Sequence, residues 1–221
     1  MFEKAVALDP QYALAYADMG WTYLTEWISQ WNRTPQILEQ ASELAQKAIA
    51  LDDSLPGPHA VLGRIYLQKM QHDQAIAEAE RAIALDPSWA EGYVHLALIL
   101  RWSGRAEKAV ELVKKAMRLN PHYPAFYQHI LGFVYCQVGQ YEEAMTAQKA
   151  ALTRNPNMLL AHICLAACYS MAGRDEEARA QVQEILRVSP KLSLETVGFG
   201  PWKNPADGKA MLDALRKAGL K

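Results

Sequence analysis

The sequence has few cysteines, almost no net charge and no long apolar run. Three cysteines among 221 residues are too few for the disulfide framework of a small secreted protein. Lys and Arg total 23 against 24 Asp and Glu, so no overall field would draw the chain to nucleic acid or anionic lipid. No 18 apolar residues follow one another, and the start, MFEKAVALDP, carries charges where a signal peptide is apolar. We therefore expect a soluble cytoplasmic protein that binds neither nucleic acid nor membrane.

The sequence also lacks the short motifs that carry chemistry. It contains no H-E-x-x-H, no glycine-rich phosphate loop and no G-x-S-x-G. Of the three cysteines, Cys164 and Cys168 lie four residues apart; we expect Cys136, Cys164 and Cys168 to be reduced core residues, and a metal or redox role is the alternative. The histidines are scattered, and His59 and His162 are expected in the core rather than as metal ligands. The sequence therefore predicts a protein that is not an enzyme and holds no cofactor or metal.

One phrase recurs along the chain at almost constant spacing. Its copies include AVALDP, AIALDD, AIALDP, AMRLNP and ALTRNP. The last residues of the successive copies are Pro10, Asp53, Pro87, Pro121, Pro156 and Pro190. The steps between them are 43, 34, 34, 35 and 34 residues. A period of 34 with small and large apolar residues at fixed offsets is typical of two helices per repeat.

The residues within each period resemble the tetratricopeptide repeat (TPR) family. In the period that ends at Pro87, the family's pattern positions are occupied by His59, Leu62, Gly63, Tyr66, Ala75, Ala79 and Ala82. Each unit pairs a small residue on its first helix with one twelve residues later: Gly63 with Ala75, Ala97 with Ala109, Gly132 with Ala144, Ala166 with Ala178. Two helices approach closely only where both side chains are small, so these pairs predict the contact between the helices of each unit.

The ends of the helices also carry sequence signals. Gly104, Gly139 and Gly173 fall just after the first helix of their units, where a left-handed C-cap is expected, and Met70 takes this position in one unit. The Asp/Asn-Pro phrase ends the second helix, because proline lacks an N–H and restricts the residue before it.

The periods predict an all-α fold, a right-handed TPR superhelical solenoid of antiparallel helix pairs with a C-terminal capping helix. Its expected parts are the second half of a truncated repeat (1–10), a repeat with a nine-residue insertion (11–53), four regular repeats (54–87, 88–121, 122–156 and 157–190) and a capping segment (191–221). Within the capping segment we expect a short helix near 192–197 and a longer one that begins at Asn204 and Pro205 and ends at Gly219.

Two irregular places are candidates for contacts with other chains. Thr34 followed by Pro35 is typical of a helix start, so the insertion is expected to lengthen both helices of its unit. Trp27 and Trp31 lie on this extension and either pack within the hairpin or form a knob for a partner. Residues 1–10 supply a second helix without its first, so the exposed terminal repeat is a candidate homodimer contact.

Resemblance to peptide-binding TPR proteins implies a concave groove lined by the first helix of each unit. Its predicted lining is Trp21, Leu24, Arg64, Leu67, Val94, Leu98, Arg101, Phe126, His129 and Phe133. TPR proteins that hold chaperone C-termini use lysine and asparagine here, whereas in this sequence only Arg64 among the matching positions is basic. We therefore expect a protein or peptide partner with an amphipathic helix or an apolar segment carrying a carboxylate. The alternative is that these residues pack against the capping segment or a symmetry mate.

Three stretches resemble the C-terminal TPR regions of larger bacterial proteins. They are ALDPQYALAYADMGW, the tryptophan-bearing insertion and the tail NPADGKAMLDALRKAGL. Those proteins carry class III adenylate/guanylate cyclase or winged-helix regulatory domains upstream. The resemblance implies an alternative function, a regulatory or dimerising arm, beside the first expectation of a non-catalytic interaction scaffold.

Overall fold

The computed structural model describes residues 2–29, 34–197 and 200–221, which form α-helices joined by turns and contain no strand. The chain divides into two units, 1–99 and 100–221, and the division falls within helix α6, Ala90–Trp102. None of the helices in the described ranges is long and apolar enough to cross a membrane. The all-α class predicted from the 34-residue period is confirmed.

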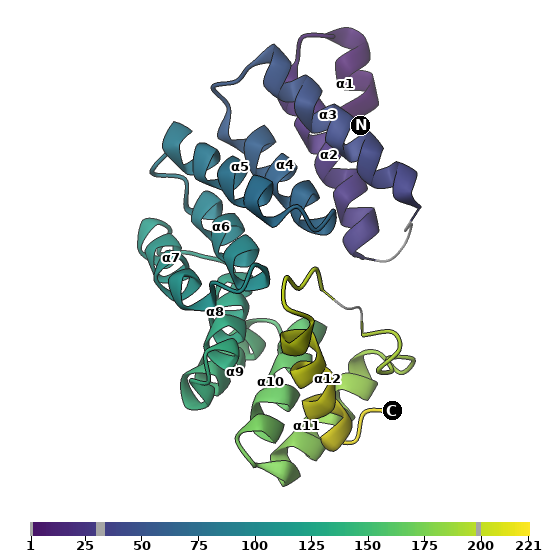
Figure 1. Ribbon diagram of the computed structural model, residues 1–221, viewed down its shortest axis with the longest axis vertical. Helices are drawn as coiled ribbons and strands as arrows, with labels where there is room; N and C mark the ends of the chain where they lie inside the picture. Colours follow the sequence, from purple (N-terminus) through teal and green to yellow (C-terminus); the bar gives the residue numbers. More distant parts are fainter. Residues whose placement is uncertain (1, 30–33, 198–199) are drawn as a thin grey trace. The chain divides into compact units, whose positions relative to one another are not determined.

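Unit 1 consists of antiparallel helix pairs (Figure 1). Its helices before α6 are α1 (Phe2–Leu8), α2 (Ala13–Ile28), α3 (Pro35–Leu51), α4 (Pro56–Gln68) and α5 (His72–Leu85). Helix α2 packs against α3, α4 packs against α5, and α3 with α4 joins the two pairs. No residue of α1 is buried, and Leu8 just inside its end is 89% exposed.

Unit 2 continues the same arrangement and ends in an added helix. After the last residues of α6 come α7 (Ala106–Leu119), α8 (Ala125–Gln137), α9 (Tyr141–Arg154), α10 (Leu159–Met171), α11 (Asp175–Val188) and α12 (Pro205–Lys217). Helix α8 pairs with α9 and α10 with α11, while α12 packs against α10 (Figure 1). The predicted capping helix is therefore present. Asn204 accepts a hydrogen bond from the Ala206 N–H (3.1 Å) at its start.

Small residues mediate the close contacts between paired helices. A Cβ atom on Gly63 would lie 2.9 Å from the carbonyl oxygen of Ala75, so any larger residue would push α4 away from α5. Three pairs have this geometry: Gly63 with Ala75, Gly132 with Ala144, and Gly20 with Ala41. The first two were predicted. The third spans the insertion and therefore lies 21 residues apart in sequence instead of twelve.

The insertion lengthens both helices of its pair, as predicted. Helix α2 continues eight residues beyond Gly20, whereas α4 continues five beyond Gly63. At 1.5 Å per residue, the three additional residues extend the helix by about 4.5 Å. Trp27 lies on this extension, half-buried against a core cluster that includes Leu24 and Ile65. Trp31, the other predicted member of the knob, is outside the described residues.

The residues that follow the first helices adopt left-handed conformations. Gly104, Gly139 and Gly173 have φ between 74° and 79°, and Met70 takes the same left-handed conformation with φ 61°. This confirms the predicted C-caps, including the departure at Met70, where a side chain is disfavoured.

The short helix expected near residues 192–197 is wrong, because this segment forms turns. Its polar groups bond locally: the Ser193 N–H donates to Thr196 Oγ1 (2.7 Å), and the Ser193 carbonyl oxygen accepts from the N–H groups of Thr196 (3.0 Å) and Val197 (2.8 Å) in a single turn. The Leu194 N–H donates to the carbonyl oxygen of Lys221 (2.8 Å), which ties the segment to the C-terminus.

Candidate functional site

The ten residues predicted to line a groove differ widely in exposure. Trp21 and Phe126 are each 39% exposed, and Arg64 and Phe133 are half-buried. The remaining six are buried: Leu24, Leu67, Val94, Leu98, Arg101 and His129. The four aliphatic residues among them offer no surface to a ligand in this structure, and Leu24 belongs to the core cluster of unit 1. The residues that could contact a partner are therefore mainly aromatic and basic.

In unit 1 the exposed Trp21 lies beside residues that the sequence did not single out. Its ring meets His95 edge-on at 5.5 Å between centroids, and Trp89 lies 5.9 Å from His95 on α6. Loss of hydration and, to a smaller extent, the positive charge of Arg64 lower the pKa of His95 to about 3. Loss of hydration also lowers the pKa of Arg64 to about 10. At neutral pH this part of unit 1 therefore combines neutral rings with one guanidinium cation.

In unit 2 the corresponding feature is Arg101, which is only 3% exposed. Its guanidinium carbon lies 3.7 Å from the ring centroid of Trp102 and 3.5 Å from that of Phe133. The ring of Trp202 is 5.3 Å away. A cation within about 6 Å of an aromatic face is attracted by the ring quadrupole, by about 2 kcal/mol when desolvated. Arg101 and its three rings, which we call the Arg101 cluster, therefore form a stable unit.

The fourth member of the Arg101 cluster comes from the capping segment. Trp202 is 9% exposed, and its ring centroid lies 4.2 Å from that of Trp102. The Lys203 N–H donates to the carbonyl oxygen of Trp102 (2.9 Å). Gly200 lies against the Trp102 ring, where no side chain would fit. Residues 200–203 therefore occupy the surface around Arg101, the packing alternative that the sequence left open.

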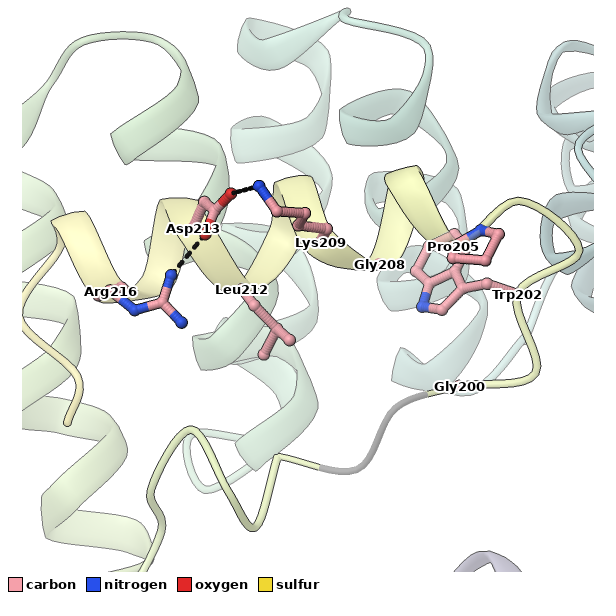
Figure 2. Close-up of a pocket in the computed structure, with 8 residues that line it drawn as sticks. All are labelled: Gly200, Trp202, Pro205, Gly208, Lys209, Leu212, Asp213 and Arg216. Atoms are coloured by element: carbon pink, nitrogen blue, oxygen red, sulfur yellow. Dashed lines mark hydrogen bonds and ion pairs between the residues drawn. The ribbon is translucent and has the colours of Figure 1, made fainter.

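This segment and α12 together line a surface pocket of about 350 Å³, whose residues are drawn in Figure 2. Trp202, Pro205 and Leu212 supply the apolar lining of the pocket. Gly208 leaves room for the Trp202 ring, because a Cβ at this position would lie 2.6 Å from Cδ1 of Trp202. On one side, Asp213 accepts from Lys209 (3.1 Å) and from Arg216 (2.5 Å), as the dashed lines in Figure 2 show. Asp213 therefore compensates part of the positive charge beside an apolar hollow.

His129 is buried and bonds to its own helix pair. Its Nδ1 lies 3.0 Å from Oε1 of Gln148, whose Nε2 donates to the His129 carbonyl oxygen (3.0 Å). Burial lowers the pKa of His129 to about 4, against an opposing effect of the Gln148 hydrogen bond. The ring is therefore neutral at pH 7. The imidazole is held between α8 and α9 by Gln148 and offers little surface in this structure, so its place in a peptide-binding groove stays a prediction.

The cysteines correct a second expectation. Cys136 of α8 and Cys168 of α10 form a disulfide, with Cα atoms 5.9 Å apart, rather than two reduced core thiols. Cys164 is buried and free, and burial raises the pKa of its thiol to about 12. His59 and His162 are buried as predicted, with His59 Nδ1 2.7 Å from Glu78 Oε2.

Comparison with known proteins identifies the repeat. The tetratricopeptide repeat family matches residues 60–124 and 135–193, together more than half of the chain. The solved structure of YrrB, described as a TPR protein with an unusual peptide-binding site, is 19% identical, with a TM-score of 0.56 over 86% of this chain and 93% of that chain. The APC/C hetero-tetramer Cut9-Hcn1 is 19% identical, with a TM-score of 0.78 over 99% of this chain and 38% of that one.

A shorter match is to the putative adenylate cyclase 3 of Rhizobium meliloti (strain 1021). It is 43% identical over 63 residues, which are 28% of this chain and 11% of that protein. The chain thus matches only a small part of this relative. The helix pairs, the 34-residue period and the two matched regions together establish that the chain belongs to the tetratricopeptide repeat family.

Proposed function

We propose that the protein is a non-catalytic scaffold that binds an extended peptide of a partner protein on the surface of unit 2 around Arg101. One observation carries this proposal: the chain's own residues 200–203 already lie there as a peptide would. A ring, a backbone hydrogen bond and a glycine contact hold them, through Trp202, Lys203 and Gly200. TPR proteins are interaction modules, and YrrB, whose fold this chain shares, is described as peptide-binding.

The chemistry of the Arg101 cluster defines the partner. Its rings and guanidinium favour a segment with a tryptophan or another large aromatic residue next to a small one, because that is what the cluster holds now. Phe126, exposed and 6.0 Å from His129, extends the apolar surface on α8. Trp21 with Arg64 supplies a second contact area within unit 1, suited to an apolar residue beside a carboxylate.

On this proposal Trp202 is an internal ligand that a partner must displace. The apparent affinity for the partner then equals the affinity of the open site multiplied by the fraction of molecules whose site is open. If the internal contact stabilises the closed state by about 3 kcal/mol, removal of Trp202 raises partner affinity by about 10²-fold.

The test supplies the internal segment as a separate molecule. A labelled peptide of residues 196–207, TVGFGPWKNPAD, is titrated into wild type and Trp202→Ala, and its anisotropy is measured. We expect binding to Trp202→Ala, weaker binding to wild type, and loss of binding when Arg101→Glu or Phe133→Ala is added. The exposed Leu160→Ala is the matched control and leaves binding unchanged. Equal affinity of Trp202→Ala and the Arg101→Glu double variant would refute the site.

A second candidate function is that of a regulatory or dimerising arm of a larger bacterial cyclase or transcription regulator in the cytoplasm. The 63-residue match to a putative adenylate cyclase favours it. The coding sequence upstream of Met1 tests it directly, because an in-frame cyclase or winged-helix domain is required.

Dimerisation would use the exposed α1, where Leu8 has almost no cover. Light scattering at high concentration should then detect dimers that Leu8→Glu abolishes. Monomers alone would remove this part of the proposal.

A further inference from the structure

Four sulfur atoms gather between α8 and α10 in unit 2. Cys164, Cys168 and Met171 are spaced i, i+4 and i+7 on α10, so they lie along one stripe of that helix. Cys136 of α8 faces this stripe: its Sγ lies 3.9 Å from Sδ of Met171 and is bonded to Sγ of Cys168. Sγ of Cys164 lies 3.9 Å from that of Cys168. The three cysteine sulfurs lie within 4.8 Å of one another, and all three cysteines are buried.

We propose that, when the Cys136–Cys168 disulfide is reduced, these three cysteines bind a single Cu(I) ion, with the thioether of Met171 as an additional weak ligand. Metal–sulfur bonds of about 2.3 Å place the sulfurs of a three-coordinate site about 4.0 Å apart. The Cys164–Cys168 separation of 3.9 Å already matches this spacing. Two sulfurs at bonding distance need only separate by rotation about χ1 once the disulfide opens.

The donor set selects the ion. Thiolate and thioether sulfurs are soft ligands, which favour Cu(I), whereas zinc in structural sites is held by four thiolate or imidazole ligands. Among the described residues, this cluster contains cysteines but no histidine or carboxylate. Met171 is half-buried, so the cluster reaches toward the surface at one side.

The disulfide and the metal are mutually exclusive states of the same sulfurs. A dithiol reductant transfers two electrons and two protons to the Cys136–Cys168 bond, which yields two thiols while the reductant becomes a disulfide. Cu(I) then replaces the protons of the thiols, and these protons pass to solvent. In the oxidised chain two of the three ligands are bonded to each other, so no three-sulfur site exists. Copper loading is therefore confined to reducing conditions.

The experiment uses the full chain, reduced and freed of reductant without oxygen. Cu(I) is titrated against a chromophoric Cu(I) chelator, and X-ray absorption at the copper edge identifies the bound atoms. We expect one copper per chain with a sulfur-only shell, and none retained by the oxidised chain. Replacement of any one cysteine by serine should weaken binding at least roughly 10-fold, because even residues that only support metal ligands contribute this much.

Matched variants separate the site from general thiol binding. Met171→Leu should weaken retention, whereas Met158→Leu, a half-buried methionine outside the cluster, should not. Circular dichroism checks that each variant remains helical. The X-ray absorption spectrum of the copper-loaded wild type tests the ligands without any substitution. Nitrogen or oxygen ligands in that spectrum, no retained copper, or unchanged affinity in Cys164→Ser would each overturn the proposal. None of these outcomes bears on the peptide site, which is tested without metal.

Discussion

Replacement of Trp202 by alanine should destabilise unit 2 by about 3 kcal/mol. Truncation of a buried tryptophan typically costs about 3 to 5 kcal/mol. Trp202 keeps 9% of its surface exposed and lies in a turn segment that can partly relax, so the low end of this range applies. The lost ring contact with Trp102, at 4.2 Å, accounts for about 1 kcal/mol of the total. The remainder is lost burial against Arg101 and the backbone of Gly208.

Urea unfolding followed by circular dichroism measures this loss. Trp21→Ala is the matched control, because it removes the same side chain from a site that is 39% exposed, and it should cost less than about 1 kcal/mol. The fluorescence of the remaining tryptophans should shift to the red as Trp102 gains contact with water. Equal destabilisation by the two variants would show that residues 200–203 do not pack on the Arg101 cluster, and the argument for an internal ligand would fail.

Three further predictions test the packing and the protonation state. Met70→Gly should stabilise the chain by about 1 kcal/mol in thermal unfolding, because Met70 has φ 61° in an exposed turn; an unchanged melting temperature would contradict this. Ala109→Leu should cost about 1 to 3 kcal/mol, because Ala109 is fully buried. His129 has a folded pKa of about 4, below its unfolded value of 6.5, so its contribution to stability is full above pH 6.5 and is lost as the pH falls toward 4. That loss is about 3 kcal/mol in urea unfolding, and His129→Gln should remove it while the contribution of His95 remains; a variant profile as steep as that of the wild type would show that His129 does not titrate so low.

The sequence was sufficient for the features that repeat. Small residues twelve positions apart recur in the four regular repeats and glycines follow the first helix in three of them, so Gly63 with Ala75 and the cap at Met70 could be placed without coordinates. The longer helices of the first pair could also be predicted, because the nine additional residues between Tyr23 and Ala41 fall where the first helix ends and the second begins. Local signals of this kind depend on sequence separation alone.

What occurs once in the chain could not be predicted in this way. Trp202 contacts Trp102 across a hundred residues, and no period relates the two. The available signal was the stretch Gly200, Pro201 and Trp202 in the capping segment. It indicates that the tryptophan packs against the protein but does not identify the residues that it contacts. The contact of His129 with Gln148, nineteen residues away, involves a polar residue at a position that is Ala79, Val113 or Val182 in other units. The disulfide likewise required knowing which faces of α8 and α10 meet.

The contact between Gly20 and Ala41 has a consequence for how such proteins vary. The additional residues all fall between Gly20 and Ala41 in the sequence, and those that the structure describes lengthen α2 and α3 without changing their close approach. The length of the two helices beyond the Gly20–Ala41 contact and their packing at that contact are therefore independent properties of a repeat. A laboratory could graft a reporter loop or an epitope between these two helices and expect the rest of the solenoid to assemble as before.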